Sequence, residues 1–254
     1  MVPTIEAARA PASKIGSLVP STAAATTGAA AGSLFRHTLF MPMRDSTAND
    51  PRIAEQPASL TSALRAVAVP FLATRIGVLL AGFAAAMFIG YTPEAGEPSM
   101  WRVSADPVRN FLARWDTFWY LDIATRGYHW NGNPLEQQNV VFFPLFPSMM
   151  RAVGTAIGGH LLIAGLGVSL AAFLVALCYF WRWTADRAGV DAATGAAWLL
   201  SAFPHAIFFS AVYTESLYLL IAVSACYYAD RRLFWKAAAI GVFAGLVRPN
   251  GILL

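Results

Sequence analysis

The feature that most constrains this chain is a series of apolar stretches long enough to cross a lipid bilayer. The first extends from Ala66 to about Gly90 and is almost wholly apolar. At 1.5 Å per residue, a helix of this length covers the roughly 30 Å hydrocarbon core with some tilt. Further apolar stretches follow at about 160–181, 192–210, 214–229 and 235–254. The sequence therefore predicts an all-α, polytopic membrane protein with about five membrane-spanning helices.

Composition supports this prediction and excludes other classes of protein. Charged residues make up 13% of the chain, whereas soluble globular domains contain about 25%. The net charge of +4 comes without a basic run or a basic helix face, so we expect no nucleic-acid partner. Residues 1–60 are rich in Ala, Ser, Thr and Pro and contain no long apolar run, which predicts a disordered cytoplasmic tail before a membrane domain at 61–254. A start codon assigned too early, with Met41 or Met43 as the true start, and a transit peptide remain alternatives.

The loops between the predicted helices indicate the orientation of the chain. Cations gather in the loop after the second helix and in the loop after the fourth, at Arg182, Arg187, Arg231, Arg232 and Lys236. The loop at 211–214 has no cation. Because cytoplasmic loops are enriched in Lys and Arg, the two basic loops and the N-terminus are predicted to be cytoplasmic. The long connection at 91–159 is then extracytoplasmic, and ordered loops of this length are usually functional.

Residues 113–128, within this long loop, form an acidic and aromatic stretch. Asp106 followed by Pro107 is typical of a helix start and predicts a helix from about Pro107 to Ala124. Its large apolar side chains would form one stripe at helical spacing, namely Val108, Phe111, Leu112, Trp115, Phe118 and Trp119. Trp and Tyr favour the membrane–water interface. We therefore expect an amphipathic helix in the outer interface.

Two carboxylates of this predicted helix have different surroundings. Asp122 precedes Arg126 by four residues, in the order that favours a surface ion pair. Asp116 has no cation three or four residues away, and its neighbours there are apolar or aromatic. An acid in such surroundings has a raised pKa and is a candidate functional carboxylate. The alternative is an acid hydrogen-bonded to a loop for structural reasons.

The segment 140–147 is apolar and contains two prolines, which predicts an irregular segment that dips into the outer interface and supports the loop. Arg75 lies near the middle of the first predicted span, where a charge must face protein or water. Either it pairs with a carboxylate or it faces a polar ligand. His205, in the third span, lies roughly 20 Å from the cytoplasmic end, as a packed side chain or as part of a cavity.

The last two candidates lie near the outer ends of the fourth and fifth spans. Thr214 can cap the fourth helix and Glu215 complements its dipole, which is a structural reason for both; a Glu215 that faces an outer cavity is the alternative. Arg248 lies roughly 20 Å from the cytoplasmic side, beside Pro249 and Asn250, which weaken the helix. An intramembrane Arg beside broken backbone predicts a lipid-phosphate ligand; the alternative is an Arg that snorkels outward.

Taken together, these motifs resemble the PIG-V-like mannosyltransferase family of integral membrane glycosyltransferases. The resemblance covers roughly residues 65–254. It rests on Arg114-Trp115-Asp116 with Ile123-Ala124 and Gly127-Tyr128, on Phe142-Phe143-Pro144-Leu145-Phe146-Pro147, on Tyr213-Thr214-Glu215-Ser216 and on Arg248-Pro249-Asn250-Gly251. It implies a GT-C architecture, a large first extracytoplasmic loop with an essential acid, which by position is Asp116, and a polyprenyl-phosphate-linked sugar as donor. Because family members have more spans than five, the chain resembles the N-terminal part of a longer protein or a truncated relative.

The residues also fit this chemistry directly. Transfer from a lipid-phosphate donor needs a carboxylate that takes the proton of the acceptor hydroxyl and a cation that stabilises the departing phosphate. We expect an inverting reaction with Asp116 as general base, and Arg248 with Arg75 on the phosphate. The remaining candidates to line or support the site are His205, Glu215, Asn250, Trp115, Asp122 and Arg126.

No metal or cofactor is expected, since Asp116 and Asp122 are poorly aligned on a helix. The expected partners are the sugar donor, membrane lipids and a glycan or glycolipid acceptor. A transporter or flippase fragment and a non-catalytic membrane subunit are the alternatives.

Overall fold

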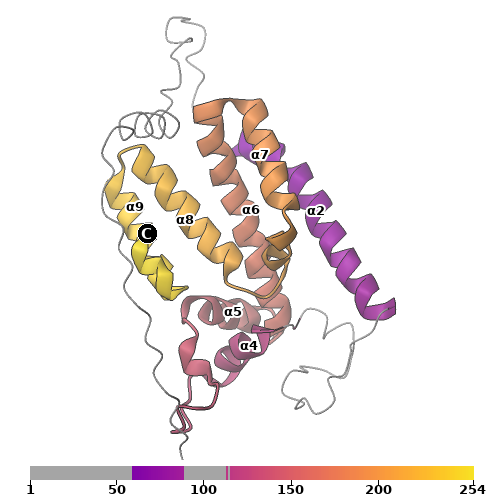
Figure 1. Cartoon of the computed structure of the whole chain (residues 1–254), viewed down its shortest axis with the longest axis vertical. Helices are drawn as coiled ribbons and strands as arrows, with labels where there is room; N and C mark the ends of the chain where they lie inside the picture. The colour runs from indigo at the N-terminus through magenta and orange to yellow at the C-terminus, as the bar shows by residue number, and fades with distance from the viewer. Residues whose placement is uncertain (1–58, 89–112, 114) are drawn as a thin grey trace, which may run out of the picture. The chain divides into compact units, whose positions relative to one another are not determined.

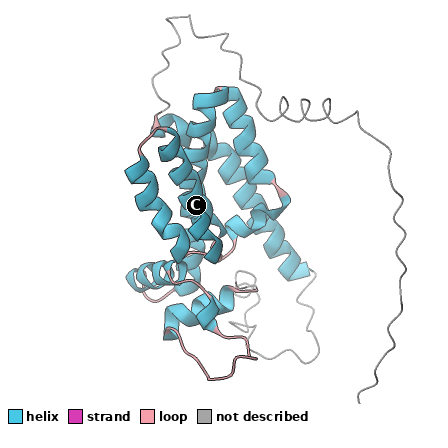
Figure 2. Ribbon diagram, turned by 60° about the vertical axis from the view of Figure 1, so that its left-hand side comes forward, coloured by secondary structure: helices cyan, strands magenta, loops and turns pink. Residues whose placement is uncertain are grey.

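The computed structural model describes residues 59–88, 113 and 115–254. The chain divides into two units, residues 1–54 and 55–254, and the described residues all belong to the second. These residues form helices joined by short loops, and no strand occurs among them (Figure 2). The tail predicted at 1–60 lies outside the described residues except for its last two positions, as do the predicted helix start at 107 and most of the first half of the long loop.

The longer helices are labelled in Figure 1, and short 3-10 segments separate some of them. The α-helices are α2 (Leu60–Phe88), α4 (Thr117–Arg126), α5 (Leu145–Ala156), α6 (Leu161–Ala188), α7 (Val190–Ala202), α8 (Glu215–Asp230) and α9 (Phe234–Gly241). The 3-10 segments are η2 (Asn139–Val141), η3 (Pro204–Ser210), η4 (Val242–Leu246) and η5 (Pro249–Leu253).

Helix α6 is the centre of the described fold. It packs against α2 and α7 on one side and against α8 on the other, and α9 packs on α8 (Figure 1). Helices α4 and α5 lie together at one end, where α5 also packs against α6. One apolar core joins α2, α6 and α7 around Val67, Phe173 and Leu177. A second core, around Phe146 and Val212, joins the α4–α5 end to α6 and α8. The second core anchors the candidate site described below.

Two described helices, α2 and α6, are long and apolar enough to cross a membrane. Helix α7 and η3 pass the same test only as one span that is bent by 80°. Only 17% of the apolar window of α2 is buried, and Leu72, Ile76 and Leu80 on its outer face are exposed, as expected for a helix that faces lipid. The chain is an all-α membrane protein, and five spans remain a prediction.

The break between α7 and η3 explains how the buried Arg75 of α2 finds hydrogen-bond partners. Its guanidinium is 2% exposed and donates to the carbonyl oxygens of Ser201, at 2.6 Å, and Ala206, and to Ser210 Oγ at 3.0 Å. It also lies 4.9 Å from the centre of the Phe173 ring. Carbonyls at a helix end have no intrahelical partner. Among the described residues Arg75 therefore has neither a carboxylate partner nor a place in the candidate site, and it stabilises broken backbone.

Three local expectations are corrected by the structure. Helix α5 begins at Leu145 and contains Pro147, because the first-turn N–H groups of a helix need no intrahelical partner. The predicted helix at 107–124 is not continuous, since Trp115 has a φ of +47° and α4 begins at Thr117. The last apolar stretch is broken rather than only kinked at Pro249, because Arg248 is extended between η4 and η5.

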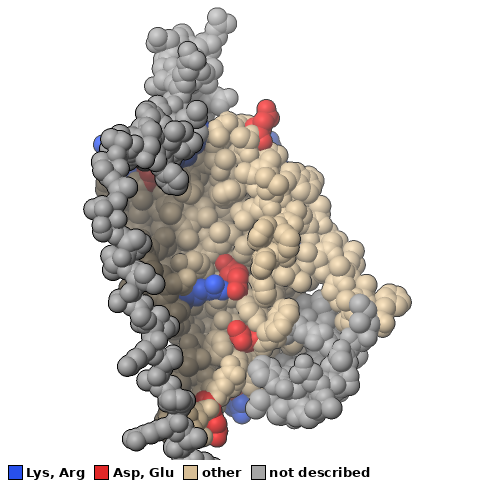
Figure 3. Space-filling model, viewed as in Figure 1, with Lys and Arg blue, Asp and Glu red and all other residues tan. Residues whose placement is uncertain are grey.

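The two basic loops lie at the same end of the bundle. Arg187, at the end of α6, forms an ion pair with Asp230 at the end of α8, and Arg231 pairs with Asp186. Helix α8 extends from Glu215 to Asp230, and 15 helical steps of 1.5 Å separate these two residues by about 22 Å. In Figure 3 the face in view is largely uncharged between its ends, apart from a small group of acidic and basic side chains. The candidate site therefore lies at the opposite end of α8 from the basic loops.

Candidate active site

The candidate site forms where three segments meet. These segments are the turn before α4, the loop before α8 and the break between η4 and η5. They contribute Asp116, Glu215 and Arg248, which the sequence predicts as site residues. Two tyrosines, Tyr120 and Tyr213, lie among them and were missed as site residues by the sequence argument.

Asp116 occupies the N-cap position of α4 but does not cap the helix. An Asp at this position ordinarily has extended backbone angles and accepts a hydrogen bond from a first-turn N–H group. Asp116 instead has helical angles (φ −70°, ψ −6°) and makes no side-chain cap bond. Burial raises the pKa of its carboxyl group. Its carboxylate is thus not engaged in capping the helix that positions it.

The backbone of Asp116 is fixed by Tyr213. The Asp116 N–H donates to Tyr213 Oη at 2.8 Å, across 97 positions of the sequence. The ring of Trp115, which is 57% exposed, contacts Tyr213 edge-on at a centroid distance of 6.3 Å and Phe208 at 5.6 Å. Trp115 therefore offers an accessible aromatic surface at the residue that precedes Asp116.

The loop that contains Tyr213 is fixed from two sides. Ser169 Oγ on α6 donates to the Tyr213 carbonyl at 3.2 Å, and Thr117 Oγ1 on α4 donates to the Val212 carbonyl at 3.4 Å. Val212 packs so closely on α6 that a Cβ at Gly165 would lie 2.5 Å from its side chain. Gly165 thus permits the close approach that places Tyr213.

Arg248 joins the third segment to this loop. Its guanidinium forms an ion pair with Glu215, and its Nε donates to Thr214 Oγ1 at 2.9 Å. Thr214 stands at the N-cap position of α8 but makes no cap bond, so the cap predicted for it is absent. The second oxygen of Glu215, Oε2, is buried without a hydrogen-bond partner in the described part of the chain.

The hydroxyl of Tyr120 lies close enough to Asp116, Glu215 and Arg248 for the charges of all three to affect its pKa. Tyr120 is 6% exposed and hydrogen-bonds the Thr214 side chain. The pKa of Tyr120 is raised to about 12, chiefly by burial; the hydrogen bond to Thr214 lowers this pKa, the charges of Glu215 and Asp116 add to the rise, and the charge of Arg248 opposes it. All three charged groups therefore act on a single phenol.

Asp122 is buried and supports the site from behind. Its pairing with Arg126 occurs as predicted, with Arg126 Nε donating to Oδ1 at 2.6 Å. The carboxylate of this pair is buried, since Asp122 is only 5% exposed, whereas Arg126 is exposed. Its other oxygen accepts from Nδ2 of Asn139 at 2.7 Å. Asn139 is fully buried and also binds the Gly127 carbonyl and the His129 N–H. This network joins the loop after α4 to α4 itself.

Two predicted residues lie apart from this cluster. His205 follows the bend after α7, is exposed, and stacks on Phe203 at a centroid distance of 5.3 Å. The depth predicted for His205 assumed one straight helix, and the bend removes that assumption. Asn250 is exposed in η5, two residues beyond Arg248. The structure gives neither side chain a described contact with Asp116 or Arg248.

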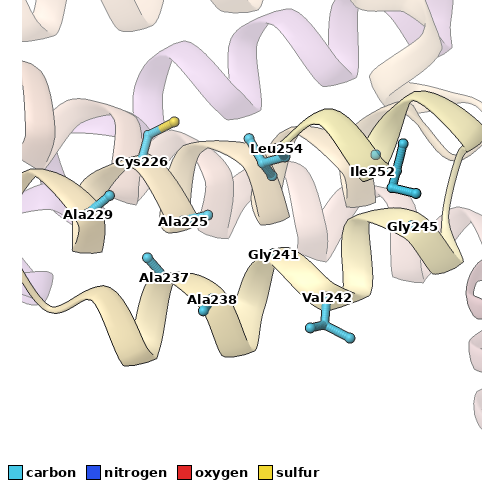
Figure 4. A pocket seen from close by; sticks show the side chains of 11 residues that line it. Ala225, Cys226, Ala229, Ala237, Ala238, Gly241, Val242, Gly245, Ile252 and Leu254 are labelled. Carbon is cyan, nitrogen blue, oxygen red and sulfur yellow. The ribbon is translucent and has the colours of Figure 1, made fainter.

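An apolar cavity of about 520 Å³ lies beside the break at Arg248. Its walls come from α8, α9, η4 and η5 (Figure 4) and consist of Ala225, Cys226, Ala229, Ala237, Ala238, Gly241, Val242, Gly245, Gly251, Ile252 and Leu254. Gly251 permits η5 to fold against η4, since a Cβ there would lie 2.1 Å from the Ala244 carbonyl oxygen. The cavity contains none of the predicted site residues.

Comparison with known proteins identifies the family of the chain. The family described as Mannosyltransferase (PIG-V) matches residues 97–254. No curated protein matches the chain, and no solved structure matches it. The family match covers more than half of the chain and includes the segments that contribute Asp116, Tyr213, Glu215 and Arg248. The chain therefore belongs to the mannosyltransferase (PIG-V) family of membrane glycosyltransferases.

Proposed function

We propose that this protein transfers a mannosyl residue from a polyprenyl-phosphate-linked donor to a hydroxyl of an extracytoplasmic glycan or glycolipid, with Asp116 as general base. The observation that carries the proposal is the uncapped Asp116 carboxylate, which lies in the same cluster as the Glu215–Arg248 ion pair. A general base must be free to accept a proton, and the negative charge of the departing phosphate must be stabilised by a nearby cation.

In this reaction the acceptor oxygen attacks the anomeric carbon of the donor sugar. The bond from that carbon to the phosphate oxygen breaks, and the phosphate leaves with the bonding electron pair. Asp116 takes the proton of the acceptor hydroxyl as the new glycosidic bond forms. Attack on the face opposite the phosphate inverts the anomeric configuration. No charge is left unbalanced, because the proton goes to the carboxylate and the negative charge to the phosphate.

Arg248 is the group proposed to bind the departing phosphate. A guanidinium has five N–H donors in a planar fork, and the described contacts direct two sides of it to Thr214 and Glu215. Its remaining donors suit a phosphate oxygen. Glu215 holds the fork in place through its ion pair with Arg248. Trp115 offers its exposed ring to the sugar.

Asp116→Asn tests this proposal in the full chain, reconstituted in lipid vesicles with polyprenyl-phosphate mannose and membrane acceptors. Loss of a general base reduces the rate by about 10²- to 10⁴-fold, so transfer by Asp116→Asn should fall by at least about 100-fold. Asp191→Asn is the matched control, because Asp191 is an exposed carboxylate in the first turn of α7, outside the site. Transfer by Asp116→Asn that stays close to the control would refute the base assignment.

A further inference from the structure

We infer that Tyr213 is a positioning residue for the transfer reaction: its hydroxyl accepts the backbone N–H of Asp116 and thereby keeps the Asp116 carboxylate from capping α4. This inference rests on the proposed role of Asp116. It assigns to Tyr213 the orientation of the base rather than contact with the reacting atoms.

The turn before α4 needs an external partner. Trp115 has a φ of +47°, and a bulky residue with positive φ persists only where its surroundings impose it. Directly after it, Asp116 has helical angles that do not permit the usual capping bond. The 2.8 Å hydrogen bond from Asp116 N to Tyr213 Oη joins this strained turn to the loop before α8.

Tyr213 is itself held in place. Its side chain is 7% exposed, and its ring contacts those of Trp115 and Phe208, at centroid distances of 6.3 and 5.5 Å. Its backbone is bound by Ser169 on α6. The hydroxyl therefore occupies a fixed point, and the turn at Asp116 must conform to it.

Without this contact, the carboxylate and the free end of α4 would attract each other. The N–H groups of the first turn and the positive end of the helix dipole favour a carboxylate at this place. A carboxylate that accepts backbone N–H groups has a lowered pKa and is a weaker base. Among the described residues, the other titratable or charged groups of this cluster are Tyr120 on α4, Glu215 on α8 and Arg248 after η4. Substitution of Tyr213 changes none of these.

Tyr213→Phe is the decisive variant, because it keeps the ring and its packing and removes only the hydroxyl. Small displacements of a reacting group cost up to about 100-fold in rate. We expect kcat to fall by about 10- to 100-fold, the donor KM to stay within about threefold, since Arg248 and Glu215 are untouched, and the acid limb of the pH–rate profile to move to lower pH. Tyr228→Phe is the control, since it also removes a hydroxyl hydrogen bond, in this case with Tyr179 Oη at 3.1 Å. Tyr228 lies near the end of α8 that is opposite the candidate site.

Three outcomes would overturn the inference. The first is a Tyr213→Phe enzyme with the kcat and acid limb of the Tyr228→Phe control. The second is an equal loss of rate at every pH with the acid limb in place, which indicates only a damaged fold. The third is a loss that falls on the donor KM. Failure of the proposed function is distinct: Asp116→Asn would then remain active, whereas failure of this inference alone leaves Asp116→Asn inactive and Tyr213→Phe normal.

Discussion

Asp116 differs from most aspartates found at the N-terminus of a helix, and this difference supports its proposed role as general base. Most aspartates at a helix N-terminus are engaged with backbone N–H groups, which stabilise the charged form. Here the backbone turns away from the capping geometry, and burial makes the charged form less favourable. The carboxylate therefore has a greater affinity for a proton than an exposed aspartate, which is the property that a general base requires.

The pH dependence of transfer follows from this raised pKa. A general base works in its ionised form, so the rate falls as pH decreases through the pKa of Asp116. Because burial raises that pKa, the acid limb should lie above the value of about 3.9 for an unperturbed aspartate. The measurement is kcat/KM for transfer across the acid range; a limb at or below the unperturbed value would contradict the prediction.

The raised pKa of Asp116 also affects how the stability of the fold depends on pH, and the direction is opposite to that of a carboxylate in an ion pair. A folded-state pKa above the unfolded value means that the protonated form of Asp116 favours folding, and this contribution is lost as pH rises through the folded pKa. Asp116→Asn resembles the protonated form. At neutral pH its melting temperature in detergent should therefore not fall below that of the unmodified protein, even though transfer is lost.

At the scale of elements, the breaks in the helices are as important as the helices. The site uses three interruptions: the turn before α4, the loop between η3 and α8, and the extended residue between η4 and η5. Backbone groups at breaks such as these can lack helical partners, and side chains from distant elements can bind them. Arg75 does this at the α7–η3 bend, and Tyr213 does it before α4.

Replacing Arg75 tests whether its role is structural. Arg75→Ala would leave the carbonyls of Ser201 and Ala206 without their donors, which typically costs about 1–3 kcal/mol for a buried group. We expect a lower melting temperature in detergent and, in the folded fraction, an unchanged donor KM. Arg65→Ala is the control, since Arg65 is exposed on the same helix. A raised donor KM at unchanged melting temperature would instead support phosphate binding by Arg75.

At the scale of the whole described unit, the candidate site and the basic loops lie at opposite ends of α8. Helix α8 spans this separation, with Glu215 and the site at one end and Asp230, paired with Arg187, at the other. The positive-inside rule assigns the basic end to the cytoplasm. We therefore propose that the site is extracytoplasmic, where the proposed lipid-linked donor would meet its acceptor.

Cysteine labelling tests this orientation. Single cysteines are placed by Asn131→Cys in the exposed loop after α4 and by Asp191→Cys beside the basic end, after Cys178 and Cys226 are replaced by Ala. In intact cells, a membrane-impermeant maleimide should label Asn131→Cys and should reach Asp191→Cys only after permeabilisation. Labelling of the two positions in the reverse order would place the site in the cytoplasm.

Local sequence patterns predicted much of the fold and part of the site. Apolar runs of sufficient length predicted helices where α2, α6 and α8 occur, and the acid-first spacing predicted the pairing of Asp122 with Arg126. These predictions succeed because helix formation and contacts between residues four apart depend on neighbours in sequence. Breaks were harder to predict, since Pro147 is tolerated within α5 whereas the bend before η3 needs a distant arginine.

The sequence by itself determined that the chain is a helical membrane protein, and it identified Asp116 as an acid without a cation three or four residues away. Only the tertiary structure decided which partners such groups have. Tyr213 lies 97 positions from Asp116, Asn139 in η2 donates a hydrogen bond to the buried Asp122, and Arg75 binds carbonyls more than 120 positions away. Such contacts arise from the packing of elements against one another, and residue spacing along a single helix contains no information about them.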